Sequence, residues 1–443
     1  MRPALLVVAL AVAGCARGPE VPPFTGEPYL VVWAGDTDRQ NSDFLAVLDA
    51  DPTSAAYGKV LKTYPVGSRG NEANALNTEP RGDRRLFATG LLTNRTFVFY
   101  FRQPIAARLV RVDEAGARRT LWAPQEPVSL PGGRVAVACS DPARYRGEAR
   151  EVVTSAGGLL ELDADGKLKR EISAAEPRGR GLLFAPSGAA VAWPAGRLVT
   201  ADTAHGYTAT TEGERMPGIG VQIWRLTDLT LVKTVALEAG PRGEENLGPV
   251  TARAMRRKPF VFVNTEGGAL YASDSVQSAD PLFRLVFDFG AGALSGGAAI
   301  TPDDRFYVVA LTGQNRVVSL DLADPWHPKQ VSSVRLDRDP ADPSRRRSGG
   351  PCTVVMGGDG TRVAVSDYTV DVPGYFRDGD HRVHILRLDP DSGRLRVDTA
   401  FLDELAGNEG IDFDRTRWPH GETGSARPKG LLFVTPEPPP ASR

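Results

Sequence analysis

The stretch Thr301-Pro-Asp-Asp-Arg-Phe-Tyr-Val-Val-Ala-Leu311, followed by Arg316-Val-Val-Ser-Leu-Asp-Leu-Ala-Asp-Pro325, contains the two patterns that decide the fold. The first pattern is a turn with Gly or Asp, then a basic or polar residue, then an apolar run. The second is an alternating strand that leads into a turn with Asp. Apolar runs of this length between turn residues are typical of β-strands. The stretch therefore predicts a buried strand followed by a hairpin.

Both patterns recur along the chain. Copies of the first begin at Tyr29, Gly82, Gly132, Ala195, Lys258, Asp303 and Asp359, and copies of the second begin at Phe44, Gly158, Val317 and Val383. Successive copies of the first lie roughly 46 to 63 residues apart, a spacing that fits four-stranded propeller blades. A single blade exposes a hydrophobic face, which stacking into a closed ring buries. The sequence predicts an all-β, seven-bladed β-propeller over residues 29–434, in which Gly430-Leu-Leu-Phe-Val434 completes the first blade; a pair of β-sandwiches is the alternative.

The chain begins with one basic residue and an apolar run, Ala4–Ala13, that is too short to span a bilayer. Small residues then precede Cys15, as in bacterial lipoprotein cleavage sites. We expect residues 1–14 to be a signal peptide, Cys15 to be lipidated, and residues 15–28 and 435–443 to be a loose tether and tail. This pattern predicts a protein of the cell envelope, on the periplasmic or outer-membrane face, that touches the membrane only through its lipid.

Composition and motifs exclude several classes of function. The formal net charge of −1 gives no broad attraction to nucleic acid, and we expect the basic cluster Arg345–Arg347 to be a solvated loop. No Gly-x-Ser-x-Gly elbow, phosphate-binding loop, His-Glu-x-x-His or Cys-x-x-Cys occurs. Beyond Cys15, only Cys139 and Cys352 remain, and we expect two free thiols, with Cys139 in a buried strand; a single disulfide is the alternative.

Several segments resemble the selenium-binding protein family, whose members include methanethiol oxidases. They include Asp43-Phe-Leu-Ala-Val-Leu-Asp-Ala-Asp-Pro52, Gly220-Val-Gln-Ile-Trp-Arg-Leu-Thr-Asp228, Ser319-Leu-Asp-Leu-Ala-Asp-Pro-Trp-His-Pro328 and Trp418-Pro-His-Gly-Glu-Thr-Gly424. The similar segments follow the family order through most of residues 29–434. The resemblance implies a propeller with copper held by histidines near its axis, and oxidation of a small thiol by oxygen.

The histidines that the resemblance implies are mostly replaced. Other side chains stand at four of the five places: Asn74-Ala75, Pro124-Gln125, Pro351-Cys352 and Pro428-Lys429. Only His420 is kept, and we expect turn or surface roles for most of His205, His327, His381 and His384. Imidazole is a strong copper ligand, whereas amides are poor ones and a lysine would repel a cation. We therefore expect no cofactor, although copper remains an alternative.

Two functions follow from these residues. The first is a binding or scaffold module without the family copper centre, with Arg253, Lys429, Asn74 and Gln125 as ligand-binding residues and an unidentified small molecule or envelope protein as partner. The second is an oxidoreductase for small thiols, in which Cys352 and His420 meet at the central opening as a catalytic or metal-binding pair. Structural roles are the alternatives: Cys352 fills the space of a lost histidine, His420 holds a turn, and Arg253 binds backbone carbonyls.

Overall fold

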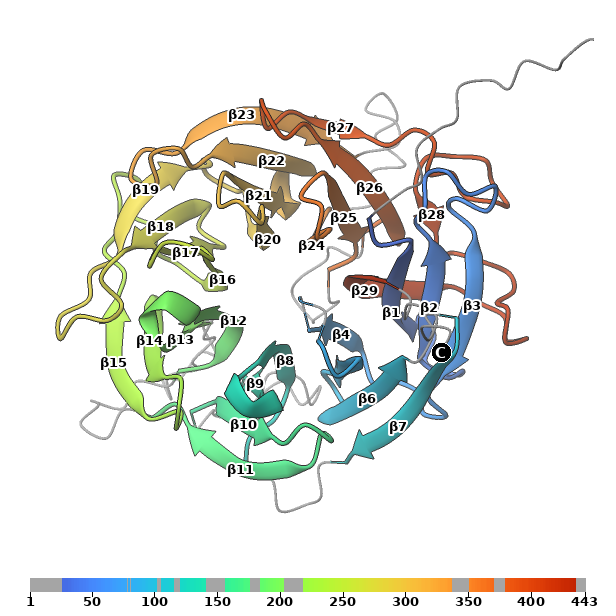
Figure 1. The fold of residues 1–443 in the computed structure, drawn as a ribbon, viewed down its shortest axis with the longest axis horizontal. Coiled ribbons are helices and arrows are strands. Elements are labelled where there is room, and N and C mark those ends of the chain that lie inside the picture. Colours follow the sequence, from blue (N-terminus) through green and yellow to red (C-terminus); the bar gives the residue numbers. More distant parts are fainter. Residues whose placement is uncertain are drawn as a thin grey trace, which may run out of the picture.

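Seven β-sheets surround a central axis and form a closed ring (Figure 1). The computed structural model describes residues 26–77, 79, 81–101, 105–114, 120–140, 156–175, 184–202, 218–336, 350–369 and 379–435. Six sheets have four strands and one has five. The predicted seven-bladed propeller is confirmed, and the β-sandwich alternative is wrong, because consecutive sheets follow one another around a single ring.

In the first four blades, the strands run in the following order from the axis outward. Blade 1 consists of β29 (Ala426–Val434), β1 (Tyr29–Asp36), β2 (Phe44–Asp49) and β3 (Val60–Pro65), and blade 2 of β4 (Ala73–Leu76), β5 (Arg85–Gly90), β6 (Arg95–Phe101) and β7 (Ala107–Asp113). Blade 3 consists of β8 (Pro124–Ser129), β9 (Val135–Cys139), β10 (Gly158–Leu162) and β11 (Leu168–Ser173), and blade 4 of β12 (Pro186–Ala192), β13 (Arg197–Asp202), β14 (Gly220–Arg225) and β15 (Leu231–Ala236).

The last three blades follow the same plan. Blade 5 consists of β16 (Pro249–Ala254), β17 (Val261–Thr265), β18 (Ala269–Ser273) and β19 (Arg284–Asp288), and blade 6 of β20 (Ser295–Ile300), β21 (Phe306–Leu311), β22 (Arg316–Asp321) and β23 (Lys329–Arg335). Blade 7 consists of β24 (Thr353–Met356), β25 (Arg362–Asp367), β26 (Arg382–Leu388) and β27 (Leu395–Val397), with β28 (Ile411–Asp412) also pairing with β26. Short 3-10 turns are η1 (Pro131–Gly133), η3 (Trp193–Ala195) and η4 (Thr312–Gln314).

The two sequence patterns occupy fixed places in the blade. Every copy of the turn and apolar run forms the second strand from the axis: β1, β5, β9, β13, β17, β21 and β25. The alternating strand with its Asp turn begins the outer hairpin, as in β2–β3, β10–β11, β22–β23 and β26–β27. The C-terminal strand β29 closes the ring as predicted, since it pairs antiparallel with β1 from Tyr29–Val434 to Asp36–Ala426.

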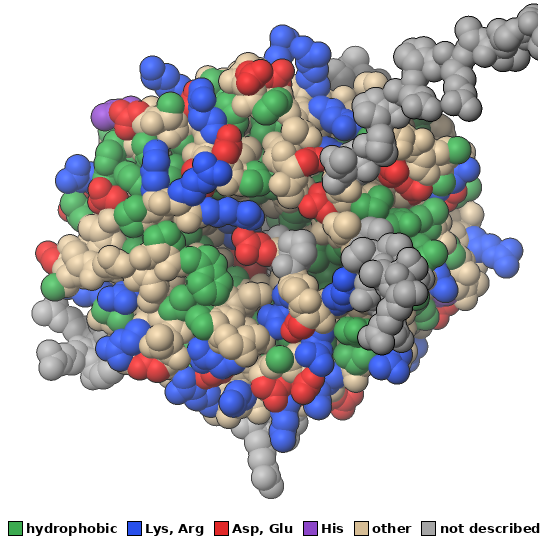
Figure 2. Space-filling model, in the orientation of Figure 1, with side chains coloured by type: hydrophobic (Ala, Val, Ile, Leu, Met, Phe, Trp, Pro, Cys, Tyr) green, Lys and Arg blue, Asp and Glu red, His purple; other side chains and the backbone are tan. Residues whose placement is uncertain are grey.

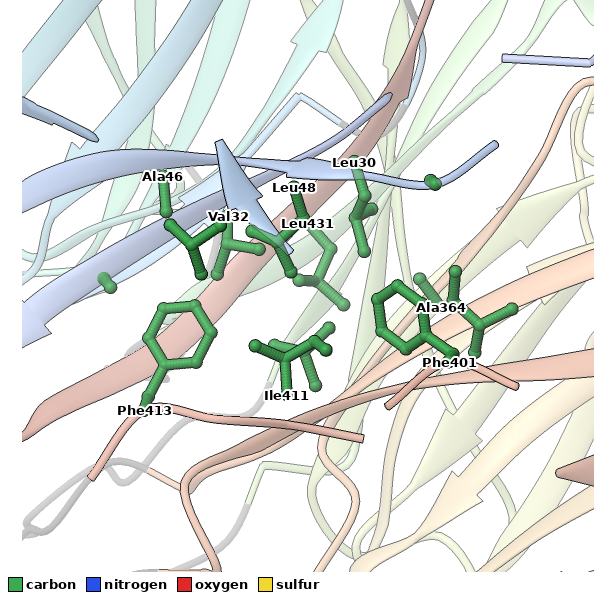
Figure 3. Close-up of a cluster of buried hydrophobic side chains, with 14 of the residues drawn as sticks. Leu30, Val32, Ala46, Leu48, Ala364, Phe401, Ile411, Phe413 and Leu431 are labelled. Carbon is green, nitrogen blue, oxygen red and sulfur yellow. The ribbon is translucent and has the colours of Figure 1, made fainter. Parts of the chain in front are cut away.

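The hydrophobic core lies between the blades. Figure 3 shows the cluster at the closure, where Leu30 and Val32 of β1 and Leu431 of β29 face Ile411 and Phe401 of blade 7. Further clusters of this kind fill the other blade interfaces. Full burial of each such side chain is worth roughly 1.5–3 kcal/mol, and a blade on its own would lose this contribution.

Within the described residues, no helix has the length and hydrophobicity needed to span a bilayer. Cys139 lies fully buried in β9, and Cys139 and Cys352 are both thiols that form no disulfide, so the expected state of these two cysteines is confirmed. The signal peptide, Cys15, Arg345–Arg347 and His205 lie outside the described residues.

Candidate functional site

The inner strands of the seven blades begin at the same end of the axis. Hydrogen bonds join equivalent early positions on neighbouring strands: the Thr251 hydroxyl donates to the carbonyl of Gly296 at 3.1 Å, and Gly297 N–H donates to the carbonyl of Cys352 at 2.6 Å. We call this end the N-terminal mouth and define it by Asn74, Gln125, Gly296, Cys352 and Lys429.

Shifts in strand register change the direction of side chains at the N-terminal mouth. Six of the seven inner strands change register against their neighbour near this end. In β29, Gly430 pairs with Trp33 and Pro428 pairs with Ala34, so Lys429 is an extra residue with no opposite residue in β1. A β-bulge of this kind bends the strand and changes the direction of a side chain.

Asn74 and Gln125 also lie at register shifts, in β4 and β8. The Asn74 side-chain amide donates to Gln125 Oε1 at 2.9 Å and to the carbonyl of Pro124 at 3.2 Å. Gln125 Nε2 in turn donates to the Ser140 hydroxyl at 2.9 Å. The structure therefore brings these two predicted site residues together as a hydrogen-bonded amide pair.

Cys352 and Lys429 form the second pair at this mouth. Lys429 Nζ lies 2.9 Å from Cys352 Sγ and donates to the carbonyl of Tyr368 at 3.3 Å. The ammonium also lies 5.8 Å from the centre of the Tyr368 ring, within the range of a cation–π contact. Lys429 is 9 % exposed, whereas Cys352 is partly exposed. Two predicted residues thus meet, with the thiol on the more accessible side.

Glu72 connects the Cys352–Lys429 pair to a set of basic side chains. The Tyr368 hydroxyl donates to Glu72 Oε1, while Arg39 lies 3.1 Å and Arg427 3.8 Å from Glu72 Oε2. The Arg427 guanidinium also lies 5.4 Å from the centre of the Tyr368 ring. The buried Glu72 carboxylate is therefore engaged by the Tyr368 hydroxyl and by two guanidinium groups.

Asp43 supports the backbone beside Glu72. Its carboxylate accepts hydrogen bonds from the N–H groups of Asp36 at 3.0 Å and Asn71 at 2.9 Å. Burial raises the pKa of Asp43 to about 6, against the lowering effect of these N–H donors, and the nearby Glu72 charge adds to the rise.

Arg253 lies further along the axis and has an acidic partner that the sequence did not reveal. Its guanidinium lies 3.0 Å from Glu126 on β8, and its Nε donates to the carbonyl of Ala298 at 2.5 Å. The Arg253 side chain is 16 % exposed and that of Glu126 is 12 % exposed. The carbonyl-binding role is confirmed, and the pair joins blade 5 to blade 3. In the sequence, Glu126 could have been noticed as the only charged residue of the inner strand β8, directly after Gln125.

His420 does not reach the mouth. Its Nδ1 lies 2.6 Å from the Thr63 hydroxyl, and its Nε2 lies 3.0 Å from Glu422, so both ring nitrogens are engaged. Thr63 belongs to β3, the outermost strand of blade 1, which is three strands away from β29. Strands are spaced by about 4.8 Å, which puts roughly 14 Å between β3 and the strand of Lys429. The predicted approach of Cys352 and His420 is wrong, and the turn-holding alternative describes His420.

The other described histidines divide between surface and core. His327 is exposed and bonded to Asp324 at 2.8 Å, as expected. His381 and His384 are 2 % and 6 % exposed, so neither has a surface role. His381 directly precedes β26 with a φ of 52°, which fits the turn role that was the other expectation. His384 lies in β26, a strand in the middle of blade 7, whose faces are covered by the adjacent blades. Among the described residues, no three His, Cys, Asp or Glu side chains are grouped to hold a metal ion.

A cavity of about 500 Å³ opens where the inner strands end, on the opposite side from the N-terminal mouth. It is lined by residues that include Trp193, Arg256, Ile300, Met356, Leu432 and Phe433. Glu79 and Arg256 form a 3.4 Å ion pair beside it, with both side chains more than half exposed. Figure 2 shows a hollow at the centre of the ring bordered by acidic, basic and hydrophobic side chains.

Known proteins resemble both the sequence and this geometry. A methanethiol oxidase from Hyphomicrobium sp. is 26% identical over 333 residues, which cover 70% of this chain and 71% of that protein. The solved structure of a hypothetical selenium-binding protein from Sulfolobus tokodaii superimposes with a TM-score of 0.72 at 17% identity, over 95% of this chain and 97% of the other. In sequence and in fold, the chain is similar to the selenium-binding protein family.

Other similarities are narrower. Protein NirF from Pseudomonas aeruginosa is 31% identical over 117 residues, which cover 26% of this chain and 28% of NirF. The periplasmic gluconolactonase PpgL of Pseudomonas aeruginosa has a TM-score of 0.60 at 14% identity, over 92% of this chain and 99% of that chain, and so shares the fold. No family model matches the chain. The similarity in sequence therefore comes from a relative that matches 70% of the chain, and the solved structures show the shared fold.

Proposed function

We propose that this chain is a binding module of the cell envelope, which takes a small molecule at its N-terminal mouth and lacks the copper centre attributed to its family. The observation that carries the proposal is the 2.9 Å contact between Lys429 Nζ and Cys352 Sγ. A protonated lysine has no lone pair to offer a metal and repels a cation. The ammonium thus occupies the space beside the one soft ligand at this mouth.

The remaining donors also fit copper poorly. The amides of Asn74 and Gln125 are bonded to each other, and neutral amide groups are weak ligands for copper. His420 has both nitrogens in hydrogen bonds at the outer edge of blade 1. No step of the proposed function therefore runs through a metal.

The chemistry of the mouth suits a small molecule with a negatively charged group. Lys429 supplies an ammonium, and the Asn74–Gln125 pair supplies amide groups that can exchange hydrogen bonds with a ligand. Arg253 is already held by Glu126 and by a backbone carbonyl, so its part is to support the wall of the site.

Copper analysis of the purified full-length chain tests the proposal. We expect no stoichiometric copper after loading with Cu(I) and no peroxide when methanethiol and oxygen are supplied. One copper per chain together with thiol-dependent peroxide would overturn the proposal.

A variant with histidine at Asn74, Gln125, Cys352 and Lys429 is the matched control. We expect this variant to gain copper affinity, since imidazole would replace two amides, a thiol and an ammonium at one mouth. Failure of the folded variant to bind copper would contradict the assignment of these four places to the family's ligands.

The alternative is an oxidoreductase for small thiols, suggested by the name of the methanethiol oxidase relative. The separation of His420 from Cys352 speaks against these two residues as its catalytic pair. Turnover of methanethiol that is lost in Cys352→Ser and kept in His420→Ala would favour this function with Cys352 alone. Absence of turnover in the unmodified chain would exclude it.

The envelope location rests on the residues before the propeller. The apolar run and the small residues that precede Cys15 support lipidation at that cysteine. Labelled fatty acid should enter the unmodified protein and not a Cys15→Ser variant. Equal labelling of both proteins would refute the anchor.

A further inference from the structure

The charge balance around Lys429 points to chemistry at Cys352. Lys429 is nine-tenths buried, and among the described residues no carboxylate lies within ion-pair distance of its ammonium. Its polar partners are the Cys352 sulfur and one carbonyl. A buried charge needs a partner of opposite sign, and the group here that can become an anion is the thiol.

The Glu72 carboxylate has other partners than the Lys429 ammonium: it accepts from the Tyr368 hydroxyl and forms ion pairs with Arg39 and Arg427. The carbonyl of Tyr368 contributes only a dipole to the ammonium. An ammonium at hydrogen-bonding distance stabilises negative charge on a sulfur, and thiolates are the reactive form of cysteine.

Access distinguishes Cys352 from the other described thiol. Cys352 is partly exposed at the N-terminal mouth, whereas Cys139 is fully buried in β9. A reagent that enters the mouth therefore meets Cys352 and Lys429 together.

We propose that Cys352 is a thiol-modification site that reacts with small disulfides carrying an anionic group, with Lys429 as its positioning residue. The Cys352 thiolate attacks one sulfur of the disulfide and forms a new S–S bond. The old S–S bond breaks, and the second half leaves as a thiolate with the electron pair, so no other oxidant is needed. The anionic group of the attached half then replaces the lost thiolate as the partner of the Lys429 ammonium.

This inference deepens the proposed binding function, because it names a ligand class for the same mouth. The two proposals are tested independently. Copper loading tests the proposed binding function, and the reaction of Cys352 with disulfides tests this inference.

The test uses the full-length chain and two aromatic disulfides. The dianionic reagent is dithiobis(nitrobenzoate), and the neutral reagent is dithiodipyridine. Each rate is divided by the rate of a free small thiol with the same reagent, which removes intrinsic differences between the reagents. We expect native protein to favour the dianionic reagent by about tenfold or more, and mass spectrometry to place the modification on Cys352 and not on Cys139.

Variants at Lys429 decide its role. Lys429→Met should abolish the preference for the dianionic reagent, while Lys429→Arg should keep most of it. Unfolded variants are recognised because Cys139 then reacts as well. The proposal is overturned if Cys352 fails to react in native protein, or if folded Lys429→Met keeps the preference for the dianionic reagent.

Discussion

Asp43→Asn should change how the stability of this propeller depends on pH. Asp43 is fully buried, and its carboxylate holds the backbone N–H groups of Asp36 and Asn71 next to Glu72. Burial raises its pKa from the ordinary value of 3.8 to about 6. The native protein therefore keeps a proton on Asp43 over a pH range in which the unfolded chain has already released it.

The sign and the size of the pH dependence of stability follow from this difference in proton binding. Between about pH 4 and pH 6 the native state binds more protons than the unfolded state, so the contribution of Asp43 to stability falls as pH rises. A rise of about two units in the pKa corresponds to a contribution of about 3 kcal/mol to the free energy of unfolding. This contribution is fully lost above pH 6. Below pH 4 the group is protonated in both states and the contribution is constant.

Urea denaturation of both proteins at a series of pH values between about 4 and 7 measures the effect. Asparagine cannot ionise, so the stability of the variant has no contribution from the titration of residue 43. We expect the stability of the unmodified protein relative to Asp43→Asn to fall by about 3 kcal/mol across this range. A constant difference, or one that grows with pH, would refute the burial argument.

Two further predictions concern the walls of the axis. Arg253→Met should lower the free energy of unfolding by about 3 kcal/mol, because it leaves the buried Glu126 carboxylate without its partner; an unchanged midpoint in thermal denaturation would contradict this. Gly188→Ala should lower the free energy of unfolding by about 1–3 kcal/mol, since a Cβ there would lie 2.4 Å from the carbonyl oxygen of Val250. Gly82→Ala is the control, because a Cβ at Gly82 has no atom within 4 Å, and it should be nearly neutral in the same assay. Equal effects of the two glycine substitutions would show that the inner strands of blades 4 and 5 have room to separate.

The candidate site was only partly visible in the sequence. Asn74, Gln125, Cys352 and Lys429 could be named from the places where the resemblance implies histidines, and the structure brings them together as two pairs. Their pairing depends on β-bulges, which change the direction of side chains without a clear signature in the residues. The predicted position of His420 at the mouth is wrong. The sequence contains no pattern that shows that the loop before β29 turns to the outer edge of blade 1.

The sequence by itself determined the all-β class, the number of blades and the closure by the last strand, because strand periodicity and turn residues are local properties that repeat in every blade. Only the tertiary structure decided that Glu126 reaches Arg253 and that Lys429 lies against Cys352. These contacts join residues 127 and 77 positions apart in the chain. They exist because ring closure brings the inner strands of separate blades to one axis, a distance relation that no local pattern encodes.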